Sequence, residues 1–199
     1  MSTRIVKDNM KGVDLTETEV ASETVFQGKL LRVKCDAVSL HDGKAATREY
    51  VEHNGAVMII PVLDSGELLM ERQFRYVLHR HCIEFPAGKI DPGEEPLATG
   101  RRELLEETGY VAREWTYLAT IHPTVAYSTE RILVYLARGL EHRGSKLDDG
   151  EHLEVLELPL AALLDLVRSG EITDVKTVIG VFWLEKLRRG EWLAGPVLP

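Results

Sequence analysis

Residues 88–110 read GKIDPGEEPLATGRRELLEETGY, and this stretch decides the fold that the chain is expected to adopt. A helix is predicted over 96–108, because proline is favoured in the first turn of a helix and glycine directly after its last turn. Successive helical residues are rotated by about 100° about the axis. Glu103, Glu106 and Glu107 therefore share an arc of about 100°, so the helix presents three carboxylates on one face.

The opposite face of this predicted helix is mostly apolar. It carries Leu97, Ala98, Leu104 and Leu105, and it is interrupted by Arg101. Like charges three or four residues apart destabilise a helix unless a partner neutralises them. A divalent cation can do so with carboxylate oxygens as ligands, whereas a solvated acidic face is the ordinary alternative.

Seven fixed positions separate these two interpretations. They are Gly88, Glu94, Arg102, Glu103, Glu106, Glu107 and Gly109. At a background frequency near 7% for each position, chance would produce this coincidence about once in 10⁸. The pattern resembles the Nudix box, GX5EX7REUXEEXGU, in which U is a bulky aliphatic residue. Leu104 fits the first U, and the aromatic Tyr110 departs from the last.

The resemblance implies a metal site built from the box. Glu103 and Glu107 are expected to bind Mg²⁺, with Mn²⁺ as the alternative cation, and Glu106 to serve as a further ligand and in catalysis. The backbone carbonyl of Ala87 would complete the site, and Arg102 would hold the glutamates in place for catalysis. The implied reaction is attack of water on the phosphorus of a diphosphate. The metal would neutralise the bridging oxygens and lower the pKa of the water.

The resemblance also implies an α+β Nudix fold, a mixed β-sheet sandwiched between helices. The 199 residues would fit a core domain with an extra module. Strand-like patterns from Glu19 to Val51 predict three short antiparallel strands, a unit that needs a partner surface. We therefore expect an N-terminal lead-in and three-stranded dimerisation module over 1–52, and a Nudix hydrolase domain over 53–199.

The remaining elements follow from apolar runs and turn residues. Further strands are predicted at 56–63, 67–74, 82–85, 115–121, 131–138 and 153–158, and helices at 160–169 and 176–189. Asp64-Ser65-Gly66 predicts a hairpin turn between the first two of these strands. Strands and helices alternate too little for a doubly wound fold, which favours the mixed α+β class.

Composition narrows the classes of partner. The chain has 32 acidic and 24 basic residues, and a net charge of −8 repels nucleic-acid backbones, so no nucleic-acid partner is expected. Cys35 and Cys82 lack the spacing of a disulfide framework or a structural zinc site. The apolar stretch 56–63 is far shorter than the roughly 20 residues of a membrane span. With no apolar signal segment at the start, a cytoplasmic enzyme without a membrane partner is expected.

Segments outside the box resemble the ADP-ribose pyrophosphatase branch of the Nudix family over residues 20–190. They are Arg48-Glu49 with His53-Asn54-Gly55-Ala56-Val57, Arg72-Gln73-Phe74-Arg75-Tyr76, Glu84-Phe85-Pro86-Ala87-Gly88, Ser128-Thr129-Glu130-Arg131 and Gly170-Glu171-Ile172-Thr173-Asp174. The resemblance implies hydrolysis of a nucleoside diphosphate sugar, with ADP-ribose giving AMP and ribose 5-phosphate. It also implies a homodimer with exchanged N-terminal strands and a small-molecule substrate bound between subunits.

Four side chains in these segments are expected to bind substrate: Arg48, Arg75, Glu84 and Glu130. A guanidinium group suits phosphate because it can bond two oxygens at once, although an exposed surface arginine is the ordinary alternative for each. Val125 departs from the branch, which usually carries a proline sixteen residues past the last box glycine. The choice of ADP-ribose over other nucleoside diphosphate sugars therefore stays open.

The general base is expected outside the box helix. Glu151 is the first candidate and Asp149 the second, in an acidic stretch that precedes the apolar strand 153–158. A solvated turn is the alternative for this stretch. Loops that close over a substrate often carry such residues.

Two other functions compete with ADP-ribose hydrolysis. One is hydrolysis of another nucleoside diphosphate derivative, such as GDP-mannose, NADH or a dinucleoside polyphosphate. The other is a nucleotide-binding Nudix module without turnover, which would be expected to lose box glutamates. All four glutamates are present here, which favours an enzyme.

Overall fold

The structure, a computed structural model, describes residues 12, 14–144, 147 and 152–198. The chain divides into two compact units. One unit is Met1–His53 together with Ala126–Ser128, and the other is Asn54–Val125 together with Thr129–Pro199. The box helix lies in the second unit.

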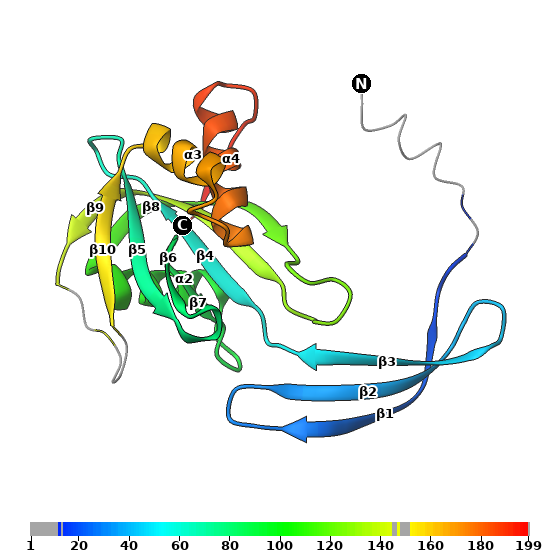
Figure 1. Ribbon diagram of the computed structural model, residues 1–199. Helices are drawn as coiled ribbons and strands as arrows, with labels where there is room; N and C mark the ends of the chain where they lie inside the picture. The colour runs from blue at the N-terminus through cyan, green and yellow to red at the C-terminus, as the bar shows by residue number, and fades with distance from the viewer. Residues whose placement is uncertain (1–11, 13, 145–146, 148–151, 199) are drawn as a thin grey trace. The chain divides into compact units, whose positions relative to one another are not determined.

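The first unit is a three-stranded antiparallel sheet in the order β1-β2-β3 (Figure 1), which confirms the three predicted antiparallel strands. Its strands are β1 (Thr18–Gln27), β2 (Arg32–Ser39) and β3 (Ala45–Glu52). All ten residues of β1 are exposed, whereas Asp36 and Val38 of β2 are buried. The amide of Val51 donates to the carbonyl of Tyr127 at 3.0 Å, so segment 126–128 extends this unit beside β3.

The second unit contains two sheets. The larger sheet has the order β11-β8-β9-β4-β7, and it is mixed because β4 and β9 run parallel. Its strands are β4 (Ala56–Pro61), β7 (Ala87–Lys89), β8 (Tyr110–Ile121), β9 (Ile132–His142) and β11 (Val197–Leu198). The smaller, antiparallel sheet has the order β10-β5-β6. Its strands are β5 (Leu68–Arg75), β6 (Arg80–Glu84) and β10 (Leu153–Leu158), with the 3-10 turn η1 (Tyr76–Leu78) between β5 and β6.

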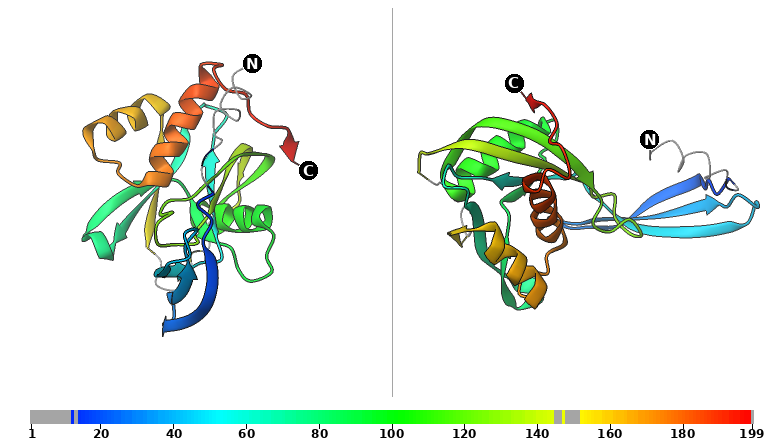
Figure 2. Two further views of the ribbon diagram at one scale, coloured as in Figure 1. Left: turned by 90° about the vertical axis from the view of Figure 1, so that its right-hand side faces the viewer. Right: turned by 90° about the horizontal axis from the view of Figure 1, so that it is seen from above.

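Three helices complete this unit: α2 (Pro96–Thr108), α3 (Leu160–Ser169) and α4 (Val175–Arg188). The first two have the predicted bounds, and α4 begins and ends one residue earlier than predicted. Asp174 caps α4 by accepting a hydrogen bond from the amide of Thr177 at 3.0 Å, which fixes that start. α3 and α4 lie against each other (Figure 2). Within the described part of the chain, no helix is long and apolar enough to cross a membrane.

β4 organises the core because all six of its residues are buried. Val57 and Ile59 on one face pack in a core with Leu104 of α2. Met58 and Ile60 on the other face pack in a core that includes side chains of α3 and α4. Successive strand residues point to opposite faces, so a continuous apolar strand is expected where helices cover both sides. The predicted α+β class, with a mixed sheet between helices, is confirmed.

The hairpin predicted at 64–66 is only partly present. The turn forms, because the amide of Gly66 donates to the carbonyl of Leu63 at 2.8 Å. However, β4 and β5 belong to different sheets, and the bridge between Val62 and Leu68 is isolated. β4 is already paired with β7 and β9 on its two edges, and β5 with β6 and β10. The strands that the turn connects therefore cannot pair along their length.

Candidate functional site

The box helix α2 packs closely against the large sheet at Gly100. A Cβ atom at this position would lie 3.2 Å from Cγ1 of Val57 and 3.3 Å from Cζ3 of Trp115. Both neighbours are fully buried, so the absence of a side chain at position 100 lets the helix backbone approach the sheet. The helix ends at Gly109, which adopts the left-handed conformation at φ 77°.

This close approach corrects the two-faced helix expected from the sequence. The buried residues of α2 are Thr99, Gly100, Leu104, Glu107 and Thr108. Ala98, expected on the buried face, is exposed, and Glu107, expected on the open acidic face, is 7% exposed. The acidic and buried arcs therefore overlap at Glu107, because packing at Gly100 rotates the helix toward that side.

Arg102 is the centre of a group of three carboxylates. Its Nη1 donates to Oε1 of Glu103 at 2.8 Å and to Oε2 of Glu106 at 3.1 Å. Its Nε and Nη2 donate to the two oxygens of Glu94 at 3.1 and 3.0 Å. One guanidinium thus holds carboxylates of the loop and of the helix, a geometry that suits its planar set of donors.

Glu94 connects the loop to the first turn of α2. The hydrogen bonds from Arg102, together with one from Oγ1 of Thr99 at 2.8 Å, lower the pKa of the Glu94 carboxyl to about 2. The same interaction with Glu94 raises the pKa of the Arg102 guanidinium above its ordinary value. Glu94 is therefore ionised at neutral pH, and its contacts are those of a residue that orders the loop.

Gly88 provides space for the carboxylate of Glu103. A Cβ atom at Gly88 would lie only 1.9 Å from Cδ and from Oε1 of Glu103. Any larger residue would have to displace this side chain. The first glycine of the box therefore has a direct structural reason, which is the close approach of a helix carboxylate to the backbone of β7.

Glu107 is bound to the first residue of β7. Its Oε2 accepts a hydrogen bond from the amide of Ala87 at 3.2 Å. The backbone position whose carbonyl was expected to bind metal is thus fixed by one of the expected metal-binding carboxylates. The predicted ligands Glu103, Glu106, Glu107 and Ala87 lie on α2 and on the adjoining β7.

These oxygen donors fit a hard divalent cation, which prefers carboxylate and carbonyl ligands. Among the described residues, however, no three His, Cys, Asp or Glu side chains are already grouped to hold a metal ion. Glu103 and Glu106 share the Nη1 group of Arg102, while Glu107 accepts a hydrogen bond from the amide of Ala87.

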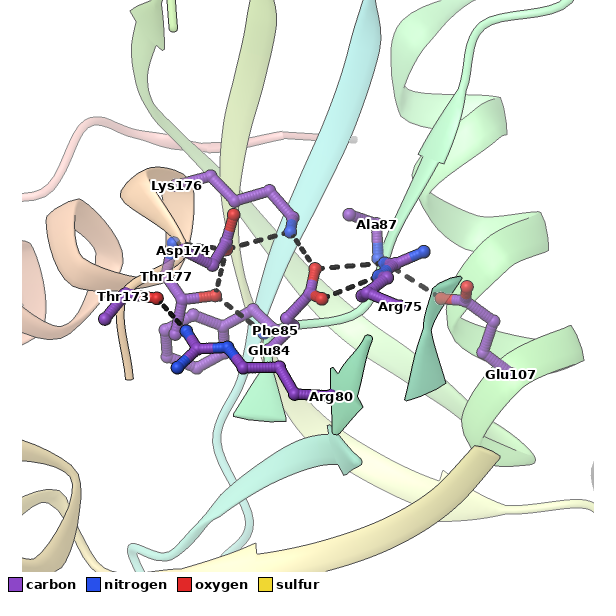
Figure 3. Close-up of polar contacts among 10 residues, drawn as sticks. All are labelled: Arg75, Arg80, Glu84, Phe85, Ala87, Glu107, Thr173, Asp174, Lys176 and Thr177. Atoms are coloured by element: carbon purple, nitrogen blue, oxygen red, sulfur yellow. Dashed lines mark hydrogen bonds and ion pairs between the residues drawn. The ribbon is translucent and has the colours of Figure 1, made fainter. Parts of the chain in front are cut away.

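A second charged group lies at the junction of β5, β6 and α4 (Figure 3). Nε and Nη2 of Arg75 donate to the two oxygens of Glu84 at 2.7 and 3.0 Å. Lys176 donates to Oε2 of Glu84 and, at 2.9 Å, to Oδ2 of Asp174. Two of the predicted substrate-binding residues, Arg75 and Glu84, are thus brought together.

The pKa values in this group follow from burial and pairing. Burial alone would raise the pKa of the Glu84 carboxyl, but Arg75 and Lys176 outweigh it and lower the pKa to about 2. Burial would lower the pKa of Lys176, but Asp174 and Glu84 raise it above its ordinary value. The hydrogen bond to Glu84 is the main cause that raises the pKa of Arg75. No sequence motif indicates Lys176 as a site residue, because its partner Glu84 is 92 residues away in sequence.

The other predicted site residues belong to other parts of the chain. Arg48 belongs to the first unit, where its Nε donates to Oε2 of Glu17 at 2.8 Å. Glu130 is half-buried in the connection from β8 to β9, and Val125 in the same connection is largely exposed. The two candidates for the general base, Glu151 and Asp149, lie outside the described residues.

Comparisons with known proteins agree with this architecture. The family model described as "NUDIX domain" matches residues 52–176, and the one described as "Nucleoside diphosphate sugar hydrolase N-terminal domain" matches residues 17–51. A protein named ADP-ribose pyrophosphatase from Bacillus subtilis (strain 168) is 40% identical over 173 residues, which are 86% of this chain and 94% of the relative.

Two further similarities cover most of the chain. A protein named methanol dehydrogenase activator from Bacillus methanolicus is 34% identical over 171 residues, 85% of this chain and 92% of the relative. A crystal structure of an ADP compounds hydrolase superposes with a TM-score of 0.79 at 26% identity, covering 90% of this chain and 98% of that one. The fold expected from the box is confirmed by these matches.

Proposed function

Because this chain belongs to the NUDIX family and is a pyrophosphohydrolase, we propose that it hydrolyses the diphosphate linkage of a nucleoside diphosphate sugar. ADP-ribose is the first candidate, and its products would be AMP and ribose 5-phosphate. The name of the Bacillus subtilis relative and the match of residues 17–51 to a nucleoside diphosphate sugar hydrolase domain support this substrate class.

The observation that carries the proposal is the surplus of carboxylates around α2. Glu103, Glu106 and Glu107 lie within one and a half turns of the helix, and Arg102 donates hydrogen bonds to the first two. Enzymes of this kind depend on a divalent metal. A bound cation would balance the remaining charge and attract the diphosphate.

We assign Mg²⁺ to this site, with Mn²⁺ as the alternative. Glu103 and Glu107 would hold it, with Glu106 as a further ligand and the Ala87 carbonyl completing the set. When bound, the metal would stabilise charge on the phosphate oxygens and acidify a water molecule. Arg102 would keep the carboxylates in reach of the metal, a role supported by its hydrogen bonds to Glu103 and Glu106.

Residues outside the box have proposed roles in binding and proton transfer. Arg75, with Glu84 beside it, and Arg48 would contact phosphate or ribose oxygens, and Glu130 is proposed as a further substrate-binding residue. Glu151 is proposed as the general base, with Asp149 as the second candidate. Loss of the acidic limb of the pH–rate profile in Glu151→Gln, but not in Asp149→Asn, would support this order; the opposite result would reverse it.

We further propose a homodimer with exchanged N-terminal strands. β1 is exposed along its whole length and carries apolar side chains, including Val20 (70% exposed) and Phe26 (54% exposed). A three-stranded sheet with such side chains gains stability by covering them. Light scattering after size-exclusion chromatography should give twice the chain mass, and Val20→Asp with Phe26→Asp should give the monomer. A wild-type monomer would contradict the proposal.

A product assay tests the function itself. The chain is incubated with Mg²⁺ and a panel of ADP-ribose, GDP-mannose, NADH and a dinucleoside polyphosphate, and the products are identified by chromatography. AMP and ribose 5-phosphate from ADP-ribose, at the highest kcat/KM of the panel, are expected. Faster turnover of another member would reassign the substrate. This is the main competing outcome, because Val125 stands where the ADP-ribose branch usually carries a proline. Binding without turnover of any member would indicate a nucleotide-binding module.

A further inference from the structure

The charged group of Arg75, Glu84, Asp174 and Lys176 suggests a function for Lys176. Lys176 is 12% exposed, yet it carries a charge and bonds both Glu84 and Asp174. A buried lysine is costly unless it is paired, and an apolar residue of similar size would often stabilise a fold as well. Its pairing with a carboxylate that in turn holds Arg75 therefore calls for an explanation beyond stability.

Two sets of hydrogen bonds join the end of β6 and the residue after it to α4 (Figure 3). In the first, Lys176 connects Glu84 to Asp174, the N-cap of α4. In the second, the amide of Phe85 donates to Oγ1 of Thr177 at 3.1 Å, and that hydroxyl donates to Oδ2 of Asp174 at 2.6 Å. The orientation of the Glu84 carboxylate is thus set by the first turn of the helix.

The fixed Glu84 carboxylate in turn orients the guanidinium of Arg75. Its Nε and Nη2 are bonded to Glu84, and among the described residues its Nη1 has no hydrogen-bond partner within the chain. The Arg75 side chain is 42% exposed, whereas that of Glu84 is 7% exposed. The guanidinium is therefore held along one edge by a buried carboxylate and offers its other edge to a ligand.

The expected ligand of that edge is a phosphate group, because guanidinium binds phosphate oxygens with directed hydrogen bonds. Glu84 and Ala87 are three residues apart, at most about 10 Å along an extended chain. Ala87 is bonded to Glu107 of the box at 3.2 Å. The ordered guanidinium and the carboxylates of α2 therefore adjoin the same short segment.

We propose that Lys176 is a positioning residue, which fixes the Glu84 carboxylate so that Arg75 presents its free edge to the diphosphate of the substrate. Without Lys176, one oxygen of Glu84 would lose its second cation and the carboxylate could rotate. Arg75 would then lose its fixed orientation, and diphosphate binding would carry the entropic cost of ordering its side chain. This inference rests on the proposed function for the identity of the substrate, but not for the coupling itself.

Four proteins test the coupling: wild type, Lys176→Met, Arg75→Ala and the double variant. Isothermal titration calorimetry with inorganic diphosphate in EDTA measures binding without turnover, and ADP-ribose kinetics with Mg²⁺ measure KM and kcat. Lys176→Met should weaken diphosphate binding about tenfold and raise KM about tenfold, with kcat changed less than about twofold. In the Arg75→Ala background the same substitution should change both by less than about twofold, because the residue through which it acts is gone.

Two further variants separate positioning from folding. Lys176→Arg keeps the charge and should recover binding to within about threefold of the wild type. Lys186→Met, on the same helix, removes a lysine from the half-exposed pair with Glu191 and should leave KM and diphosphate binding unchanged. Equal effects of Lys176→Met with and without Arg75, or loss of kcat and thermal stability without a change in binding, would overturn the proposal. If the wild type turned over no panel substrate, the proposed function would fail, while the calorimetric cycle would still decide the coupling.

Discussion

The two charged groups of the second unit are arranged in opposite ways. Around α2, one cation, Arg102, contacts Glu94, Glu103 and Glu106, and Glu107 lies on the same helix, so one positive charge faces four negative ones. At the start of α4, Arg75 and Lys176 pair with Glu84 and Asp174, so two charges of each sign are present.

This difference indicates which group needs a partner from solution. The group at α4 is electrically balanced, and its Glu84 and Lys176 side chains are largely buried, so its pairs satisfy one another and can fix a geometry. Among its named residues, the group at α2 has three more negative than positive charges, and a divalent cation would offset part of this excess. Substitutions in the group at α2 should therefore alter chemistry more than stability. Substitutions in the group at α4 should alter stability and substrate binding.

The largest effect is expected from Glu107→Gln. We expect kcat to fall by about 10²–10³, because a metal ligand at the reacting phosphate is lost, while the melting temperature stays within a few degrees. Steady-state kinetics and thermal unfolding measure the two quantities. Glu114→Gln, at an exposed position of β8, is the matched control and should keep full activity. Undiminished turnover in Glu107→Gln would refute the assignment of this carboxylate.

Glu84 should govern the acid stability of the balanced group. Its pKa is about 2 in the folded chain against an ordinary value of 4.5, so the unfolded state binds more protons between these pH values. The stabilisation is complete above pH 4.5 and is lost as the pH falls toward 2, by up to roughly 3 kcal/mol.

Urea unfolding of the wild type and Glu84→Gln across this range measures the effect. Glu84→Gln should be less stable near neutral pH, because it leaves Arg75 and Lys176 without their carboxylate. The gap between the two proteins should narrow as the pH falls toward 2. A gap that stays constant over this range would show that Glu84 does not carry the linkage.

Gly88→Ala should separate activity from stability in the unbalanced group. The added methyl would collide with the Glu103 carboxylate, which is the flexible end of a side chain and can move aside. We expect kcat to fall about tenfold, with a change in unfolding free energy within roughly 0.5 kcal/mol. Kinetics and urea unfolding on the same preparation decide this. Full activity would mean that the position of Glu103 next to β7 is unimportant for turnover.

How much of this could be predicted depended on how local each signal was. α2 and α3 were predicted at their observed bounds, because proline, glycine and apolar periodicity act within a few residues. The predicted pairing of β4 with β5 as a hairpin was wrong, because strand pairing depends on competing partners far along the chain. The faces of α2 were misjudged because the close approach at Gly100 is a property of the packed sheet.

The candidate site shows the same division. The box glutamates were found from their spacing, since they lie on one helix. The contacts of Arg102 could be expected in kind, because Glu103 and Glu106 are neighbours on α2. The pairing of Lys176 with Glu84 spans 92 residues. It could not be predicted, because no local sequence pattern indicates that β6 and α4 lie close together.

The smallest effect is a stabilisation by metal that should belong to one group only. Mg²⁺ several-fold above its Kd should stabilise the wild type by about 1 kcal/mol, or about 2–4 °C in melting temperature. The shift should disappear in Glu107→Gln and persist in Lys176→Met. An equal shift in all three proteins would mean that the metal binds outside the α2 group.

The metal dependence of ADP-ribose hydrolysis tests the central claim most directly. Turnover by the wild type is measured after EDTA treatment and during titration with MgCl₂, with AMP and ribose 5-phosphate quantified. We predict no turnover in EDTA, saturable recovery with Mg²⁺, and almost no recovery for Glu107→Gln at any concentration. Undiminished release of AMP in EDTA, or equal recovery by Glu107→Gln, would contradict a metal-dependent pyrophosphatase site built on the glutamates of α2.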